Sequence, residues 1–334
     1  MIPQLARVPP PAPLHVEFLA ELQARGFEGQ LSLGHADRIV LSTDNSIYQL
    51  FPQAIAFPAG TEDLVRIATV AAEARFRALK LAPRGGGTGT NGQSLTDGLV
   101  VDLSRNMNRI LEIDATRRRV PVQAGVVKDQ LNKALEPYGL FFAPELSTSN
   151  RATIGGMINT DACGQGSCIY GKTSHHVLSL TTVLLDGSVW TSRPLEDEEL
   201  ATVEARPDRV GAIHRLVNGI QRENAALIAE RFPKLNRSLT GYDLAHIRDA
   251  EGRFDLNAIL CGAEGTLGFI AEAELNVLPI PACSALINIR YDSFDAALRD
   301  ARALVVQQDQ HPLGGTGGLA VLRRQRRVAA GRFR

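Results

Sequence analysis

Residues 83–93 read Pro-Arg-Gly-Gly-Gly-Thr-Gly-Thr-Asn-Gly-Gln, a stretch in which five of eleven residues are glycine. Glycine has no Cβ and adopts positive φ easily, so the backbone here can approach a ligand closely. Consecutive N–H groups in such a loop can converge on an anion such as a diphosphate. Arg84 adds a positive charge, and the threonine, asparagine and glutamine side chains add polar groups. The stretch predicts a phosphate-binding loop; the alternative is a surface loop without a ligand.

The residues that follow the glycines indicate which kind of phosphate-binding loop this is. No Gly-Lys-Ser or Gly-Lys-Thr follows, which excludes a Walker loop. Gly87, Gly89 and Gly92 match the letters of the dinucleotide-binding G-x-G-x-x-G pattern, but that pattern requires a helix directly after the loop. Here a turn at Asp97-Gly98 leads into residues 99–103, an apolar run typical of a buried strand. We therefore predict strand, glycine loop, strand, and interpret the Rossmann match as accidental.

Length and composition are those of an ordinary globular protein. The chain has 334 residues, enough for two subdomains, and its 22% charged residues with a formal net charge of zero do not suggest nucleic-acid binding. The longest apolar runs are too short to cross a bilayer, and the proline-rich start lacks the order of a signal peptide. Four cysteines in so long a chain do not form a disulfide scaffold, which indicates a reducing, cytoplasmic setting.

Two α+β units are predicted along the chain. Residues 1–47 read as an N-terminal extension with a short helix at 16–24. The first unit then has a strand at 54–58, a helix at 61–74 capped by Thr61, and a strand at 79–83 that enters the glycine loop. The second unit is predicted to contain strands at 110–113 and 119–124, a helix at 127–135, a strand at 180–185 with a hairpin turn at 186–187, and strands at 257–261 and 269–277. Residues 192–250 are polar and highly charged, which is typical of a solvated helical insertion.

A second glycine motif lies at residues 152–164, Ala-Thr-Ile-Gly-Gly-Met-Ile-Asn-Thr-Asp-Ala-Cys-Gly. Its paired glycines allow close packing against a flat ligand, and a helix that begins here would present free N–H groups to that ligand. The alternative is a close helix–helix contact.

Three further side chains carry candidate chemistry. His175 and His176 titrate near neutral pH, but a histidine pair without an acidic or cysteine partner is more often structural. Glu264, in a glycine turn, is either a ligand-facing carboxylate or a cap for local N–H donors. We favour the cap.

Four motifs in this order resemble one family: residues 83–93, residues 152–164 with Tyr170-Gly171, residues 184–187 and residues 262–270. The family is the FAD-binding domain of the vanillyl-alcohol oxidase and p-cresol methylhydroxylase superfamily, in its FAD-linked oxidase branch. That branch includes D-lactate and D-2-hydroxyglutarate dehydrogenases and glycolate oxidase subunits. The resemblance covers residues 48–280 and is strongest to long bacterial D-2-hydroxyglutarate dehydrogenase-type proteins that also carry an iron–sulfur domain. It implies an α+β fold of two α/β subdomains around FAD.

The resemblance also implies which residues contact FAD. The diphosphate would lie against Arg84, Gly85, Gly86, Gly87, Thr88, Gly89, Thr90, Asn91, Gly92 and Gln93. The flavin and its ribityl chain would lie against Pro144, Glu145, Leu146, Ser147, Thr148, Thr153, Ile154, Gly155, Gly156, Asn159, Asp161, Gly164, Tyr170 and Gly171. Glu264, Gly265 and Ile270 would close over the nucleotide. Covalently flavinylated relatives often have a histidine at the glycine loop, and its absence here predicts non-covalent FAD.

The implied activity is oxidation of a 2-hydroxy acid, such as D-2-hydroxyglutarate or D-lactate, by hydride transfer to FAD and then to an unidentified electron acceptor. Relatives follow the flavin domain with a long substrate cap. Here residues 281–310 read as the start of a cap only, with a strand at 285–291 and a helix at 294–306. No His-x-Gly-Asp metal motif and no cysteine cluster for an iron–sulfur centre occurs in the sequence.

The Gly/Arg-rich tail at residues 311–334 follows this interrupted cap. We interpret it as the sign of a truncated or frameshifted product that lacks the cap and iron–sulfur domains, rather than as a nucleic-acid-binding arm. The alternative function is then an FAD-binding module without independent catalytic activity.

Overall fold

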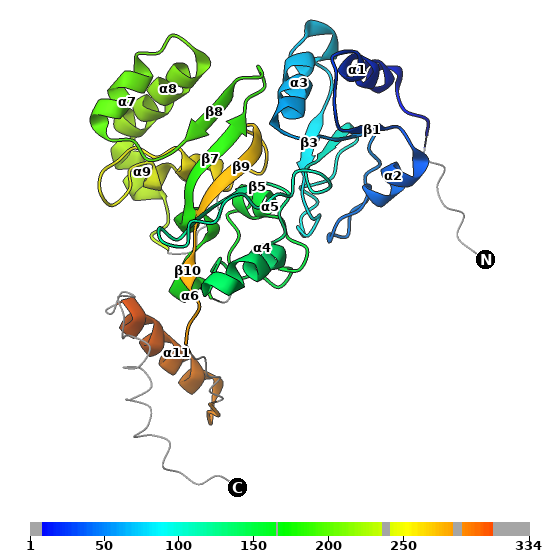
Figure 1. The fold of residues 1–334 in the computed structure, drawn as a ribbon. Helices are drawn as coiled ribbons and strands as arrows, with labels where there is room; N and C mark the ends of the chain where they lie inside the picture. Colours follow the sequence, from blue (N-terminus) through cyan, green and yellow to red (C-terminus); the bar gives the residue numbers. More distant parts are fainter. Residues whose placement is uncertain (1–8, 165, 236–240, 283–288, 310–334) are drawn as a thin grey trace, which may run out of the picture.

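The computed structural model describes residues 9–164, 166–235, 241–282 and 289–309. They form two α/β subdomains, each built on its own four-stranded sheet, followed by a helix that lies apart from both (Figure 1). The predicted α+β class with two α/β subdomains is therefore confirmed. None of the described helices is long and apolar enough to cross a membrane.

The first subdomain places the glycine loop between two parallel strands. Its sheet has the order β1-β2-β4-β3, in which β2, β4 and β3 run parallel and β1 runs antiparallel to β2. Residues 85–98 between β3 and β4 contain no helix, so the predicted order of strand, glycine loop and strand is confirmed. The elements of this subdomain are α1 (Pro13–Ala24), β1 (Gln30–Ser32), α2 (His35–Val40), β2 (Ala54–Phe57), α3 (Thr61–Ala71), β3 (Leu81–Arg84) and β4 (Leu99–Asp102).

The N-terminal residues belong to this subdomain, whereas the sequence pattern predicts an extension. Strand β1 forms one edge of the sheet through its pairing with β2. Phe18 and Leu22 of α1 are fully buried in the same core as Leu64 and Ile67 of α3. The predicted extension is wrong for the residues described because α1 and β1 bury apolar side chains that only the complete subdomain can cover.

A buried carboxylate joins this N-terminal part to helix α3. The predicted cap, Thr61, is instead the first residue of α3, and the N-cap is Gly60 with no side-chain hydrogen bond. Asp63, which is 1% exposed, accepts hydrogen bonds from the N–H groups of Glu28, Gly29 and Ala59 at 2.8–2.9 Å. One carboxylate therefore satisfies backbone donors from two separate segments.

The second subdomain has an antiparallel sheet with the order β5-β9-β7-β8. Val183 and Phe269 of this sheet are buried in the core of the first subdomain, so the two units share a packed boundary. Its elements are β5 (Arg119–Gln123), α4 (Lys128–Leu135), β6 (Leu140–Phe141), α5 (Ile154–Asn159), α6 (Ser167–Tyr170), β7 (Val177–Val183), β8 (Val189–Ser192), α7 (Asp197–Glu204), α8 (Arg209–Glu223), α9 (Ala225–Arg231), α10 (Asn257–Leu260), β9 (Phe269–Asn276) and β10 (Leu278–Pro279), with short 3₁₀ helices at Glu136–Tyr138, Thr173–His176 and Leu244–His246. A further 3₁₀ helix, at Ala74–Phe76, follows α3 in the first subdomain.

Two predicted strands are absent from this subdomain. Residues 257–261 form helix α10 instead, because the Asp255 carboxylate accepts the N–H of Asn257 and so favours a turn at this point. Residues 110–113 make only an isolated bridge, Ile110 with Val122. Leu111 donates its N–H to the carbonyl of Pro121, but proline has no N–H to donate in return, so the ladder stops there.

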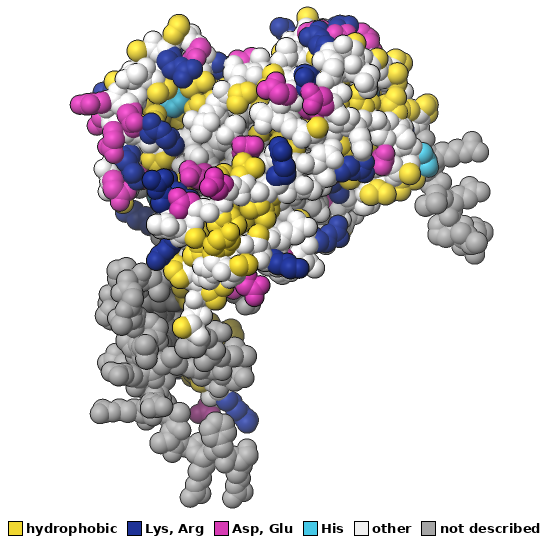
Figure 2. Space-filling view, viewed as in Figure 1, with side chains coloured by type: hydrophobic (Ala, Val, Ile, Leu, Met, Phe, Trp, Pro, Cys, Tyr) yellow, Lys and Arg dark blue, Asp and Glu magenta, His cyan; other side chains and the backbone are white. Residues whose placement is uncertain are grey.

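Helices α7, α8 and α9 lie within residues 192–250, where the sequence predicts a helical insertion. Charged side chains of both signs gather over these helices, as expected for a solvated face (Figure 2). The predicted cap helix corresponds to α11 (Phe294–Asp309), whereas the predicted cap strand lies largely outside the described residues and the Gly/Arg-rich tail lies outside them entirely.

The Asp63 network provides a test of how the N-terminal segment is held. We expect Asp63→Ala to lower the free energy of unfolding by about 2 kcal/mol, because it removes a buried acceptor that binds three backbone N–H groups and the Arg66 guanidinium. Glu62→Ala removes the exposed neighbouring carboxylate and should cost about 0.5 kcal/mol. Urea unfolding followed by circular dichroism measures both. Equal losses in the two variants would contradict the role given to Asp63.

Candidate functional site

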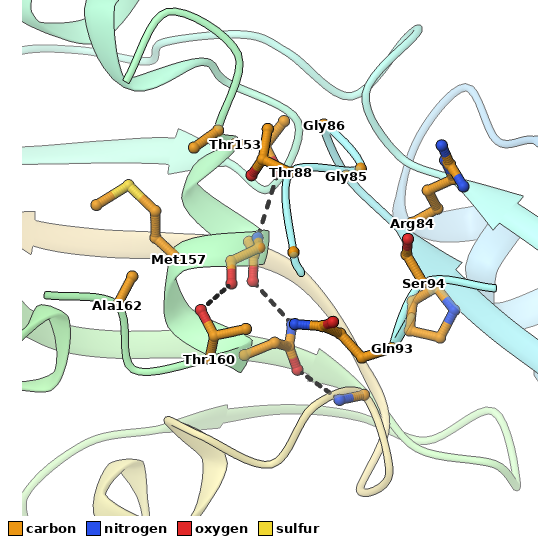
Figure 3. A pocket seen from close by; sticks show the side chains of 18 of the residues that line it. Arg84, Gly85, Gly86, Thr88, Gln93, Ser94, Thr153, Met157, Thr160 and Ala162 are labelled. Atoms are coloured by element: carbon orange, nitrogen blue, oxygen red, sulfur yellow. Dashed lines mark hydrogen bonds between the residues drawn. The ribbon is translucent and has the colours of Figure 1, made fainter. Parts of the chain in front are cut away.

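A cavity lies at the boundary between the two subdomains. The glycine loop forms one wall, helix α5 and the residues before it form the opposite wall, and the turn at residues 264–265 closes one end. Figure 3 shows Arg84, Gln93 and Ser94 on one side of this cavity and Met157, Thr160 and Ala162 on the other. The cavity thus draws its lining from segments that are far apart in the sequence.

The glycine loop lies directly against the residues that precede α5. A Cβ atom at Gly85 would lie 2.1 Å from Oγ1 of Thr153, and one at Gly86 would lie 2.1 Å from the carbonyl oxygen of Arg151. These distances leave no space for a side chain, so only glycine permits the contact at these two positions. The first glycines therefore bring the loop against the second subdomain.

The N–H groups of residues 85–90 remain available to a ligand. Within the described part of the chain, none of these six consecutive amides donates a hydrogen bond to another protein group. Residues 85–89 are half-buried and Thr90 is exposed, so these amides are open to water or to a ligand. Six in succession, in a loop that lines a cavity, suit the oxygens of a diphosphate.

Helix α5 does not supply the free amides that the sequence pattern predicts. The N–H groups of Ile154 and Gly155 donate to the carbonyls of Val126 and Ala124 at 2.8 Å, and that of Gly156 donates to Thr153 Oγ1 at 3.3 Å. The prediction is wrong because residues 124–126, which follow β5, satisfy these donors first. What α5 offers a ligand is a flat surface of small residues.

The turn at residue 264 is fixed from behind by Asn159. The Asn159 side chain accepts the N–H of Gly265 at 2.8 Å and donates to the carbonyl of Gly155 at 2.8 Å, and its backbone carbonyl accepts the N–H of Glu264. Glu264 has φ of 50° and lines the cavity, and its carboxylate makes no hydrogen bond within the described residues. The favoured interpretation of Glu264 as a cap is therefore wrong, and its carboxylate is free to face a ligand.

Arg84 lines the cavity but directs its guanidinium elsewhere. Nη1 donates to the carbonyl of Leu41 at 3.2 Å and Nη2 donates to that of Thr43 at 2.7 Å. The residue is 7% exposed, and this burial lowers the pKa of its guanidinium.

Most of the residues expected to hold FAD line this one cavity. Those that do are Arg84, Gly85, Gly86, Gly87, Thr88, Gly89, Thr90, Gln93, Leu146, Thr148, Thr153, Gly155, Gly156, Asn159, Glu264, Gly265 and Ile270. Those outside its lining are Asn91, Gly92, Pro144, Glu145, Ser147, Ile154, Asp161, Gly164, Tyr170 and Gly171. Sequence reasoning missed Pro83, Ser94, Leu103, Ala124, Ala152, Met157, Thr160 and Ala162, most of them small or apolar residues that carry no chemical signal.

Asp161 belongs to a neighbouring cavity instead. It forms a buried ion pair with Lys172 at 2.6 Å and accepts the N–H of Ser174 at 2.8 Å. In the same cavity, burial raises the pKa of Asp255 to about 6 and lowers that of His175. Among the described residues, no group of three or more histidine, cysteine or acidic side chains is arranged to hold a metal ion.

The two histidines make structural contacts. Nδ1 of His175 accepts the N–H of Lys172 at 3.4 Å, and Nε2 of His176 donates to the carbonyl of Tyr170 at 2.7 Å. Both bonds fix the backbone between α6 and β7, and neither ring lines the cavity at the glycine loop.

Comparison with known proteins agrees with the geometry of the cavity. An FAD binding domain family matches residues 52–193. The chain is 62% identical over 308 residues to the D-2-hydroxyglutarate dehydrogenase of Pseudomonas putida, covering 92% of this chain and 30% of that protein. The corresponding protein of Escherichia coli K12 is 53% identical over 306 residues, covering 91% of this chain and 30% of that protein. The chain thus spans about 30% of the length of these curated relatives.

The fold has a solved counterpart. An alkyldihydroxyacetonephosphate synthase superposes with a TM-score of 0.58 at 20% identity, covering 83% of this chain and 42% of that one. At this identity the likeness shows the fold alone. The family match over residues 52–193 and the high identity to the bacterial relatives show that the chain contains an FAD binding domain and that its cofactor is FAD.

Proposed function

We propose that this chain is the FAD-binding part of a dehydrogenase that oxidises a D-2-hydroxy acid, with D-2-hydroxyglutarate as the first substrate to test. The observation that carries the proposal is the run of unpaired amides at residues 85–90, which lines a cavity in a chain 62% identical to a D-2-hydroxyglutarate dehydrogenase. The chemistry that FAD supplies when bound is acceptance of a hydride from a carbon atom that bears a hydroxyl group.

The residues of the chain bind and orient this cofactor. The amides of the glycine loop would hold the diphosphate, so that its negative charge is met by backbone dipoles. Gly156 of α5, where a Cβ would meet only Thr153 Oγ1 at 3.2 Å, leaves space for the flavin end to lie against the helix, while Gly155 lets the helix lie against Ala124. Glu264 closes the far end, where a carboxylate can accept hydrogen bonds from ribose hydroxyls or adenine.

A second candidate function is an FAD-binding module without activity of its own. The titratable side chains that line the cavity are Arg84 and Glu264, and the guanidinium of Arg84 is already bound to backbone carbonyls. The lining therefore offers no histidine to take the hydroxyl proton of a 2-hydroxy acid. In this alternative, residues outside the described cavity must supply the proton acceptor and the substrate contacts.

Absorbance of the purified chain separates the two functions. We expect bound FAD to give flavin bands, and acid precipitation to release the flavin because it is held non-covalently. Anaerobic addition of D-2-hydroxyglutarate should bleach the bands if the chain is a dehydrogenase, and L-2-hydroxyglutarate serves as the stereochemical control. Flavin bands that persist with D-2-hydroxyglutarate and with D-lactate would establish the second function, an FAD-binding module without activity of its own. A colourless protein that takes up no added FAD would overturn both functions.

The close approach of the glycine loop gives a second test. We expect Gly86→Ala to weaken FAD binding at least about tenfold, because the new Cβ would meet the Arg151 carbonyl at 2.1 Å and the loop must move. The matched control is Gly219→Ala in α8, where a Cβ meets nothing within 4 Å. Quenching of FAD fluorescence measures both dissociation constants. An unchanged constant in Gly86→Ala would show that the loop does not contact the cofactor.

A further inference from the structure

The glycine loop is attached to the N-terminal segment at residues 41–50, which we call the brace. The side chain of Arg84 enters it and donates to the carbonyls of Leu41 and Thr43. Further along the loop, the N–H of Asn45 donates to the carbonyl of Gly87 at 3.0 Å, and the hydroxyl of Ser94 donates to the Asp44 carboxylate at 3.0 Å. The brace therefore holds the loop at its beginning, middle and end.

The brace is itself an ordered hairpin-like segment. Thr43 pairs with Gln49 as an isolated antiparallel bridge, and the N–H of Leu50 donates to the carbonyl of Ser42 at 2.9 Å. The Asp44 carboxylate also accepts the N–H of Ser46 at 2.8 Å. These internal bonds give the carbonyls of residues 41 and 43 fixed positions, so they can serve as an anchor for a buried guanidinium.

Arg84 lies directly behind the loop. A Cβ on Gly87, whose φ is 61°, would come within 2.6 Å of Nη2 of Arg84. The guanidinium is therefore packed between Gly87 and the carbonyls of the brace. The carboxylates of Asp44 and Asp102 are near enough to interact with its charge. Two of its five N–H donors are thus bound to the brace, and its charge lies near two carboxylates behind the loop.

This attachment sets the direction of the loop amides. In a trans peptide the N–H of one residue points away from the carbonyl of the residue before it. Because Asn45 of the brace binds the Gly87 carbonyl, the N–H of Thr88 points away from the brace. The bond therefore orients the Gly87–Thr88 peptide within a loop that lines the cavity.

We propose that Arg84 is a positioning residue, which fixes the glycine loop on the brace so that the loop amides, and not the Arg84 guanidinium, bind the diphosphate of FAD. This inference rests on FAD as the cofactor of the cavity. It departs from the expectation that Arg84 meets the diphosphate directly. It also gives the N-terminal segment a part in cofactor binding, although Asp44 and Asn45 do not line the cavity.

The first experiment compares FAD affinity and its salt dependence. We expect Arg84→Met to weaken FAD binding about tenfold without changing the slope of log Kd against log salt, because no charge that touches phosphate is lost. Arg84→Lys should bind FAD nearly as weakly as Arg84→Met, since one ammonium group cannot reproduce the two hydrogen bonds that the planar guanidinium donates to the carbonyls of Leu41 and Thr43. Arg117→Met, which removes an exposed arginine, is the control for net charge. A smaller salt slope in Arg84→Met, together with rescue by lysine, would overturn the proposal.

The second experiment uses the FAD-free protein, so it does not depend on cofactor binding. Hydrogen exchange should show faster exchange of brace amides, including that of Asn45, in Arg84→Met than in the wild type. Asp44→Ala removes the bond between the brace and Ser94, at the far end of the glycine loop, and should also weaken FAD binding. Its effect should not add to that of Arg84→Met. Unchanged exchange in Arg84→Met, or additive losses of affinity, would overturn the positioning role. A wild-type chain that takes up no FAD would overturn the cofactor assignment instead.

Discussion

The site depends on the contact between the glycine loop and the residues before α5. A carbonyl oxygen and a threonine hydroxyl from the second subdomain occupy the space that side chains would take at Gly85 and Gly86. With any larger residue, the first subdomain would have to move away from the second, and the cavity between them would widen. The contact at Gly86 is with a backbone carbonyl, so repacking of side chains cannot relieve it, and this position in particular requires glycine.

The two glycine motifs have different functions although both are rich in the same residue. The glycine loop leaves its amides unpaired, so it is a polar surface for an anion. Helix α5 satisfies its first amides with the carbonyls of residues 124 and 126, so its first turn presents Gly156 and Met157 to the cavity without free N–H donors. Diphosphate and flavin need these two kinds of surface, and the cavity presents one opposite the other (Figure 3).

Much of the fold could be predicted because its signals are local. The apolar runs that became β2, β4 and β9 and the absence of a helix after the glycine loop follow from hydrophobic pattern and turn residues. The failures arise from contacts that are distant in sequence. Whether the amides of α5 are free depends on residues 124–126, and the place of the N-terminal residues depends on β2 and α3. Helix α10 shows a different limit, since a short apolar run before a turn fits either a strand or a helix until a carboxylate such as Asp255 selects one.

Strand β9 has a position that bears on how the protein is made. It is the last strand of the second sheet to be synthesised, yet it lies between β5 and β7 in the middle of that sheet. While residues 269–276 are still in the ribosome, β5 and β7 have no partner in common and each presents an open edge. The sheet therefore closes late and through contacts between residues far apart in the chain, a slow kind of folding. Ile270 of this strand also lines the cavity, so the nascent chain acquires a complete cofactor pocket only after nearly the whole of both subdomains has emerged.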